Sequence, residues 1–399
     1  MRFKYPDVRE LFQAVEKMKK KRNDILSTGD KGLKEVVMNI AEGCNLTCPY
    51  CFAAQGKYGA TTSAWMSSKV AHDSLTYLLE KYPSVENIKV FGGEPFMNIP
   101  AISQVMDVKE AHESSLGHTI TVGAVTNMTV FSKKIVDLCK QGFKFAVSID
   151  GPQNIHDANR RFINGRGSFD TIVRNIEKYD KSGFRPTNID SVFTPLHLEK
   201  GLSMAQMAKY LVDTFGIDKV NISPVYYEND FINLGDFTKV IREQAFQFAY
   251  SEYNKGLSRS DWAKGVLDRI LQTRTIGWCS LGESTITVMT NGDVLPCYTL
   301  ATHRKQWLIG NVGENNKFIK VPTSTADILK NANPRTNFLC SSCEIRSICW
   351  GCPGATYSTT KKFSDRIPYR CAFRIGSIEG FLKGKIDSEK QANGLSNNK

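Results

Sequence analysis

The feature that most limits how this chain can fold is an alternation of short apolar runs with amphipathic stretches between residues 36 and 225. There are six apolar runs, at 36–40, 88–91, 119–124, 145–149, 189–194 and 220–225. The stretches between them, such as SSKVAHDSLTYLLEKY, carry apolar residues at helical spacing. Strands that alternate with helices are typical of βα units and a parallel sheet. The sequence therefore predicts an α/β fold, either a barrel or an open doubly wound sheet.

Three unusual stretches follow the first three apolar runs, and a fourth overlaps the end of the fourth run. They are CNLTCPYC, GGEP, TNM and SIDGP. In both candidate arrangements, the loops at the carboxyl ends of the strands form the functional face. We therefore expect these four stretches, which are distant in sequence, to meet on one rim.

The regions on either side of the alternating part have a different character. We divide the chain into a basic N-terminal helical segment (1–35), the α/β domain (36–230), a helical bridge (231–275), a cysteine-rich domain (276–375) and a partly disordered C-terminal tail (376–399). The cysteine-rich domain has few long apolar runs, so we expect its fold to depend on bound metal.

Composition limits the class of protein, its compartment and the kind of partner that we expect. Hydrophobic residues make up 41% and charged residues 23%, as in globular proteins. The sequence shows neither a signal peptide nor an apolar run of membrane-spanning length, so we expect a cytoplasmic protein without a membrane segment. The net charge of +12 favours an anionic partner, and charge alone leaves nucleic acid, a membrane surface and an acidic peptide open.

The cysteines point to metal chemistry. Eleven is an odd number in a chain without a secretion signal, which disfavours a complete disulfide framework. Cys44, Cys48 and Cys51 form CxxxCxxC in a loop after a predicted strand. Three thiolates this close can hold three irons of a 4Fe-4S cluster and leave the fourth iron open. Structural zinc is the alternative, but it needs four ligands, and neither a Cys nor a His follows nearby in sequence to supply the fourth.

The CxxxCxxC loop resembles that of the radical SAM superfamily. The resemblance implies a partial (β/α)6 radical SAM barrel, in which the open iron binds S-adenosylmethionine (SAM). It also implies the chemistry: one electron cleaves SAM, and the resulting 5′-deoxyadenosyl radical removes a hydrogen atom from the substrate.

Further residues are similar to positions that bind SAM in this family. The resemblance implies cofactor contacts for Tyr50, for Gly92, Gly93, Glu94 and Pro95, for Thr126 and Asn127, and for Ser148, Asp150 and Arg160. Met128 departs from the family, which has Gly there. For Arg160 two roles stay open, a bidentate contact to the SAM carboxylate and a structural salt bridge. We interpret His156 as a hydrogen-bonded loop histidine rather than a base.

A second cysteine set follows residue 278 and resembles the SPASM extension, which binds two auxiliary 4Fe-4S clusters. Its members are Cys279, Cys297, Cys340, Cys343, Cys349, Cys352 and Cys371. The resemblance implies three clusters in all: the SAM-binding one, one closed by Cys340, Cys343, Cys349 and Cys371, and one with an open iron held by Cys279, Cys297 and Cys352. Cys349 and Cys352 are closer in sequence than the family pattern. A zinc ribbon is the alternative, and we expect Cys139 to be a buried core thiol.

These features predict a maturase that crosslinks a ribosomally made precursor peptide, through a thioether or a C–C bond. The expected partners are that peptide and an electron donor such as flavodoxin or ferredoxin. About 35 residues precede the first predicted strand, so leader recognition is expected from a separate protein, the basic N-terminal helix or the domain surface. One alternative is an anaerobic sulfatase-maturing enzyme, although two closed auxiliary clusters need more than the seven thiolates present. The other is a zinc-stabilised nucleic-acid-binding protein, which lacks support from any RNA-binding aromatic motif.

Overall fold

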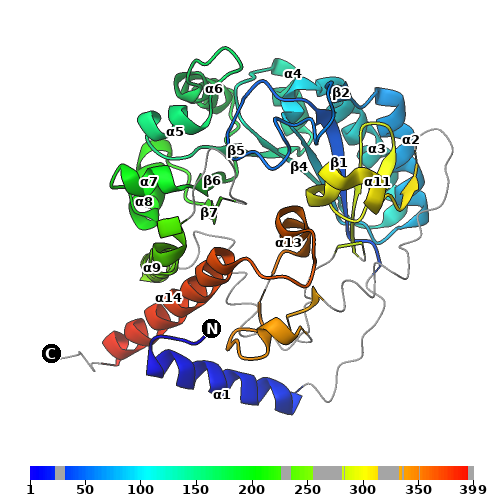
Figure 1. Cartoon of the computed structure of the whole chain (residues 1–399). Coiled ribbons are helices and arrows are strands. Elements are labelled where there is room, and N and C mark those ends of the chain that lie inside the picture. Colours follow the sequence, from blue (N-terminus) through cyan, green and yellow to red (C-terminus); the bar gives the residue numbers. More distant parts are fainter. Residues whose placement is uncertain are drawn as a thin grey trace.

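A computed structural model describes residues 1–22, 32–225, 235–254, 281–282, 284–312, 332–334, 337–349 and 351–393. All six predicted apolar runs are strands: β1 (Glu35–Glu42), β3 (Asn87–Gly92), β4 (Thr121–Thr126), β5 (Lys144–Ser148), β6 (Ile189–Phe193) and β7 (Val220–Pro224). They pair in parallel in this order, as Figure 1 shows. The predicted α/β fold is therefore confirmed as a partial (β/α)6 barrel. Within the described residues the sheet does not close on itself.

Helices cover the outer face of this sheet. They are α2 (Ser68–Lys81), α3 (Ile99–Leu116), α4 (Lys133–Lys140), α5 (Gln153–Asn159), α6 (Phe169–Lys181), α7 (Pro195–Glu199) and α8 (Met204–Phe215). Local signals fix their ends: α8 begins with a capping box between Ser203 and Gln206 and ends at Gly216 in the left-handed conformation. Ile88 and Val90 of β3 are buried among residues of α2 and α3 in one continuous core.

The cysteine-rich part extends the same sheet. β8 (Thr285–Val288) pairs in parallel with β1, and β9 (Asp293–Leu295) and β10 (Gly310–Asn311) continue it in antiparallel fashion. The short strand β2 (Ala64–Trp65) pairs with the end of β1. The remaining elements are η2 (Pro95–Met97), η4 (Tyr298–His303), α11 (Arg304–Trp307), η5 (Phe338–Cys340) and α13 (Pro353–Thr360). β1, which leads into the first cysteine loop, thus pairs with β3 on one side and with β8 of the cysteine-rich part on the other.

Three more helices lie in the lower part of Figure 1: α1 (Pro6–Arg22), α9 (Gly235–Asn254) and α14 (Pro368–Ala392). Gly376, Gly380 and Gly384 lie where α14 meets α9. A Cβ atom on Gly380 would stand 2.2 Å from the carbonyl oxygen of Phe246, so the two backbones are in direct contact. Of the predicted bridge 231–275, the described residues 235–254 are α9, and 255–275 lie outside the described residues.

The predicted C-terminal tail is wrong for residues 376–392, because α14 runs through the proposed boundary to Ala392. Ile378 and Phe381 are buried against the apolar face of α1. The buried Glu379 accepts a hydrogen bond from the Tyr5 backbone N–H at 3.1 Å and pairs with Arg242 at 2.7 Å. Burial and these bonds order the helix, whereas its mixed sequence shows little apolar periodicity. Residues 394–399 lie outside the described residues.

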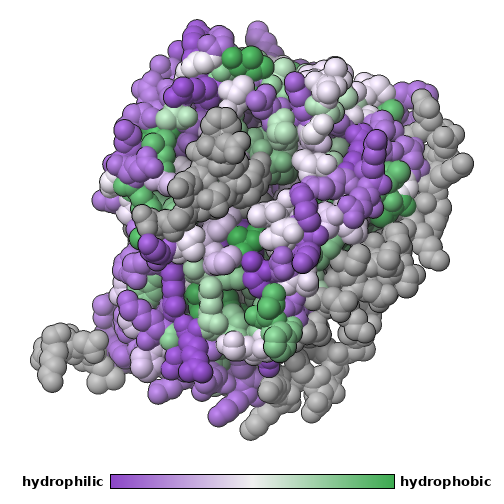
Figure 2. All heavy atoms as spheres, in the orientation of Figure 1, coloured by the Kyte–Doolittle hydropathy of each residue, from purple (hydrophilic) through white to green (hydrophobic). Residues whose placement is uncertain are grey.

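Hydrophilic residues cover much of the face shown in Figure 2, and apolar residues appear there in small groups. None of the helices in the described ranges combines the length and the apolar character that crossing a membrane would require.

Candidate functional site

The CxxxCxxC loop leaves the carboxyl end of β1 and is partly buried. Cys44 and Cys51 lie close enough to Cys48 for a negative charge on either sulfur to act on the Cys48 thiol. Burial raises the pKa of Cys44 and of Cys48 to about 12. A metal would have to displace these protons, and thiolate donors of one short loop suit iron. The donor set therefore fits three corners of a 4Fe-4S cluster.

Glu94 of the GGEP stretch is fully buried and held from both sides. Its Oε1 accepts hydrogen bonds from the Phe96 N–H at 2.8 Å and the Thr126 hydroxyl at 2.6 Å, and Oε2 accepts one from the Asn127 N–H at 2.6 Å. Burial raises the pKa of Glu94 to about 7 in spite of these bonds. A positively charged ligand group would restore the carboxylate to its ordinary ionised state.

The two glycines of GGEP allow other atoms to lie close to their backbone. In this structure those atoms belong to other residues of the same chain. A Cβ atom on Gly93 would stand 2.3 Å from the carbonyl oxygen of Gly43 and 2.8 Å from Cα of Gly56. Gly92 has φ +148° and lies against Ala41. These glycines therefore seat the GGEP turn on the cysteine loop, and Pro95 then begins η2.

The TNM stretch connects to the same loop through Asn127. Its Nδ2 donates to Asn45 Oδ1 at 2.9 Å and lies 3.6 Å from Cys44 Sγ. Thr129 donates to Asn127 and accepts from Asn45, which closes the ring of contacts. Met128 takes the left-handed conformation, φ 57°, that Gly provides in the family pattern. Sequence reasoning missed Asn45 and Thr129, for which the motifs give no signal.

Asp150 organises the third part of the rim. It is fully buried, accepts a hydrogen bond from the Val192 N–H at 3.0 Å and pairs with Arg160 Nε at 3.0 Å. The Tyr50 hydroxyl donates to the same carboxylate, and the Arg160 guanidinium lies 5.5 Å from the centre of the Tyr50 ring. Burial alone would raise the pKa of Asp150, but the charge of Arg160 holds it below its ordinary value. Of the two roles left open for Arg160, the structure shows the salt bridge.

The neighbours of Asp150 are structural. His156 Nδ1 accepts the Asp150 N–H at 3.2 Å, and its Nε2 lies 3.0 Å from the Ser168 hydroxyl. Burial lowers the pKa of His156 to about 4. The expected hydrogen bonds are present, but the expected loop position is wrong, because His156 lies in α5. His197, which sequence reasoning missed, donates to the Asp150 carbonyl oxygen at 3.0 Å. Ser148 is partly buried at the end of β5.

A second group of thiols surrounds a cavity in the C-terminal part. Cys340, Cys343, Cys349 and Cys371 line it, and the charge of each of the first three acts on Cys371. Four arginines line the same cavity: Arg346, Arg366, Arg370 and Arg374. Arg366 Nε donates to Cys340 Sγ at 2.7 Å, while its Nη2 is buried without a partner. Four thiols with an unmatched guanidinium group fit an anionic iron–sulfur cluster.

Cys297 belongs to another group. It follows β9 and is partly buried, and burial raises its pKa to about 11, with the charge of Cys352 raising it further. Cys352 caps α13 and also lines the arginine-rich cavity, so it lies between the two groups. Cys279, the third predicted ligand here, lies outside the described residues. The ten described cysteines are thiols, and Cys139 is buried as expected.

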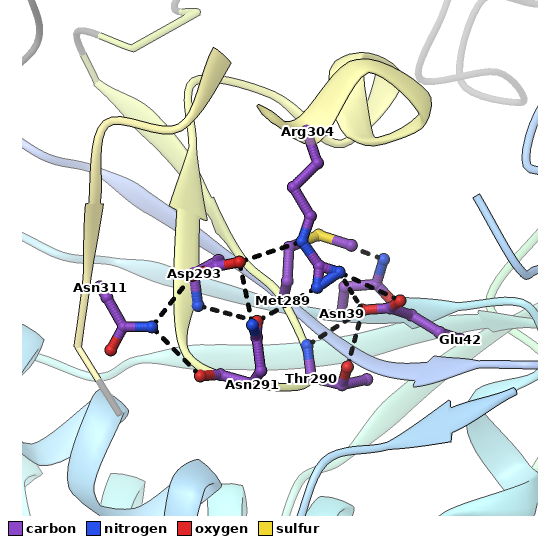
Figure 3. A network of polar contacts seen from close by, with 8 residues as sticks. All are labelled: Asn39, Glu42, Met289, Thr290, Asn291, Asp293, Arg304 and Asn311. Carbon is purple, nitrogen blue, oxygen red and sulfur yellow. Dashed lines mark hydrogen bonds and ion pairs between the residues drawn. The ribbon is translucent and has the colours of Figure 1, made fainter. Parts of the chain in front are cut away.

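A polar network joins the two cysteine-bearing parts, as Figure 3 shows. Glu42, at the end of β1, accepts a hydrogen bond from the Thr290 hydroxyl at 2.7 Å and pairs with Arg304 at 3.2 Å. Arg304 also pairs with Asp293 of β9 at 3.0 Å. Because Glu42 lies just before Cys44, this network ties the first cysteine loop to the β8–β9 hairpin.

Comparison with known proteins gives two family matches. Residues 38–210 match the family described as the radical SAM superfamily, and residues 279–353 match SPASM, described as an iron–sulfur cluster-binding domain. The chain is 24% identical over 316 residues to a cysteine-type anaerobic sulfatase-maturating enzyme of Clostridium perfringens, covering 72% of this chain and 83% of the relative.

Two solved structures share the fold. One is native anSMEcpe with bound AdoMet and Kp18Cys peptide, with a TM-score of 0.69 and 20% identity, covering 89% of this chain and 99% of that chain. The other is Streptococcus suis SuiB bound to precursor peptide SuiA, with a TM-score of 0.50 and 16% identity, covering 84% of this chain and 74% of that chain.

Proposed function

This chain belongs to the radical SAM superfamily and carries a SPASM domain, and from that premise we propose that it is a maturase that crosslinks a ribosomally made peptide. When bound, the cofactors supply a 5′-deoxyadenosyl radical that removes a hydrogen atom from the substrate. Hydrogen removed from one residue allows its carbon to bond to a cysteine sulfur or to another carbon of the same peptide. A thioether is the proposed product.

The observation that carries this proposal is the separation of the auxiliary thiols. Cys340, Cys343, Cys349 and Cys371 surround one cavity, Cys352 lines its edge, and Cys297 lies outside it with Cys352 as its thiol neighbour. With Cys279, the second group has three thiols in the sequence, one fewer than a closed cubane uses. An open position of soft character there suits a peptide thiolate. We propose three 4Fe-4S clusters in all.

The residues of the rim would then have distinct tasks. Glu94 provides a buried carboxylate for the amino group of SAM, and Asn127 holds the first cysteine loop in place. Arg160 and Asp150 fix Tyr50 beside Cys48, so that the cofactor side of the loop is shaped before any ligand arrives. Such preorganisation lowers the cost of placing the cofactor.

The partners follow from the same chemistry. Reductive cleavage of SAM needs one electron, for which we propose a carrier protein such as flavodoxin or ferredoxin. The precursor peptide is the substrate, and the net charge of +12 favours an acidic leader. A separate recognition protein remains one of the proposed routes for leader binding.

Formylglycine formation is the second candidate, and the likeness to the Clostridium perfringens enzyme favours it. That reaction removes sulfur from a target cysteine, whereas a thioether retains it. The product therefore separates the two candidates.

The test is to co-express the enzyme with small precursor peptides encoded beside its gene and to measure their mass. A crosslink removes two hydrogens and blocks alkylation of one cysteine. Loss of sulfur would favour formylglycine, and an unmodified peptide from every co-expression would contradict both. Cys297→Ala should keep SAM cleavage and stop the modification, while Cys139→Ala, a buried thiol outside both groups, serves as the matched control.

A further inference from the structure

Lys89 is a cation that none of the motifs explains. It lies on β3 between Ile88 and Val90, which are buried in the core among α2 and α3. Because side chains alternate along a strand, Lys89 points to the opposite, inner face of the sheet. There it lines an open cavity of about 290 Å³ together with Lys144 and Asp190. Among the described residues no carboxylate forms an ion pair with Lys89.

The ammonium of Lys89 is held over an aromatic pair that leads to the auxiliary site. Its Nζ lies 5.2 Å from the ring centre of Phe91 and 5.4 Å from that of Tyr298. The two rings have centres 4.5 Å apart. Cation–π contacts of this kind fix the position of the charge without neutralising it.

This contact places a positive charge beside Cys297. Tyr298 directly follows Cys297, and the charge of Lys89 acts on that thiol in the direction opposite to burial. The same aromatic pair reaches the other cysteine loop, because Phe52, which follows Cys51, lies 6.0 Å from Tyr298 between ring centres. Lys89 therefore belongs to the barrel, and its ammonium lies over the ring of the residue that follows the auxiliary thiol.

We propose that Lys89 is a positioning residue that sets the electrostatic potential at the Cys297 site, so that an iron–sulfur group held there accepts an electron more readily. A fixed positive charge stabilises the state that carries one more negative charge. Asp190 lines the same cavity, but it accepts hydrogen bonds from Asn188 at 2.9 Å and Asn221 at 3.0 Å and leaves Lys89 unpaired.

The inference rests on the proposed crosslinking, in which one electron must leave the substrate. The hydrogen atom taken from the peptide carbon ends in 5′-deoxyadenosine, and the thiol loses its proton to solvent. When the carbon radical bonds to the thiolate, one electron remains, and an iron–sulfur group held by Cys297 would supply its acceptor. A positive charge at Lys89 makes this last transfer more favourable.

The test is a redox titration, followed by electron paramagnetic resonance, of the full-length protein loaded with iron and sulfide under anaerobic conditions. Lys89→Met removes the charge and keeps the chain length, whereas Lys89→Arg keeps the charge. Lys144→Met is the matched control, because Lys144 lines the same cavity but is exposed. Cys297→Ala identifies the signal that belongs to this site.

We expect the Cys297 signal to shift to a more negative midpoint potential in Lys89→Met and to stay at the wild-type value in Lys89→Arg and Lys144→Met. An unchanged potential in Lys89→Met would overturn the proposal. If Lys89→Met and Lys89→Gln both lose that signal while Lys89→Arg retains it, the charge is needed to hold the group and not to set its potential, which would overturn the proposal. Loss in Lys89→Arg as well would show a packing role and overturn it. Because no peptide is used, the result is independent of whether crosslinking occurs.

Discussion

Cys44, Cys48 and Cys51 come from one loop anchored on β1, whereas Cys340, Cys343, Cys349 and Cys371 are gathered from η5, the turns after it and the start of α14. The first group sits among hydrogen-bonded polar groups such as Asn127 and Glu94 and near the ion pair of Asp150 with Arg160. The second faces arginines, one of which keeps an unmatched buried nitrogen. On our proposal, the difference teaches that strands of the sheet anchor the first cluster site, while the second needs an anionic cluster to match its arginines.

The largest expected effect comes from removing the first thiol group. Replacing Cys44, Cys48 and Cys51 together by Ala should abolish formation of 5′-deoxyadenosine, because the SAM-binding iron loses its ligands. The auxiliary iron should stay at about eight per chain, since the second group is built from other elements. Product analysis and iron determination check this, and continued SAM cleavage would contradict the assignment.

Removal of iron should change the local stability of the two cysteine-bearing regions to different extents. After chelation, we expect backbone amides of η5 and α13 to exchange at least about tenfold faster, because the arginine-lined thiols lose the group they surround. Amides of β1, β3 and β4 should keep their protection, since the core of the sheet contains no metal ligand. Hydrogen exchange measured with and without iron tests this, and equal loosening of both regions would remove the contrast.

The next effect is on stability and comes from the buried ion pair of Asp150 with Arg160. Arg160→Met leaves Asp150 buried without its partner and should lower the free energy of unfolding by about 3–5 kcal/mol. Arg161→Met, at an exposed neighbouring position, should change it little. Chemical denaturation of the iron-free proteins measures both. A double variant that also carries Asp150→Asn should recover part of the loss, and equal effects of Arg160→Met and Arg161→Met would contradict the role of the pair.

The smallest effect concerns pH. Burial lowers the pKa of His156 to about 4 in the folded protein, so between this value and 6.5 the unfolded chain binds more protons. Stability should therefore fall as pH drops through this window, by up to about 3 kcal/mol. His156→Gln should flatten the dependence, whereas His72→Gln, at an exposed position, should not. Denaturation curves at several pH values test it.

Sequence reasoning located the elements but not the contacts between them. Apolar runs identified six strands of the parallel sheet but not β8, which also pairs in parallel with β1, and cysteine spacing identified both thiol-bearing parts. The pairing of Glu42 with Arg304 could not be found this way, because it depends on β8 lying beside β1, and 262 residues separate the partners. The close contact of Gly93 with Gly43 was equally invisible in the sequence, because it depends on how the GGEP turn and the cysteine loop pack together.

The glycines of α14 have a consequence for how the protein tolerates change. Because Gly376 and Gly380 bring α14 onto the backbone of α9, a single added methyl group would wedge the helices apart instead of filling a gap. Deleting α14 would expose the face of α9 on which it packs and would also remove Cys371. α14 is therefore a poor place for deletions or for substitution of its glycines.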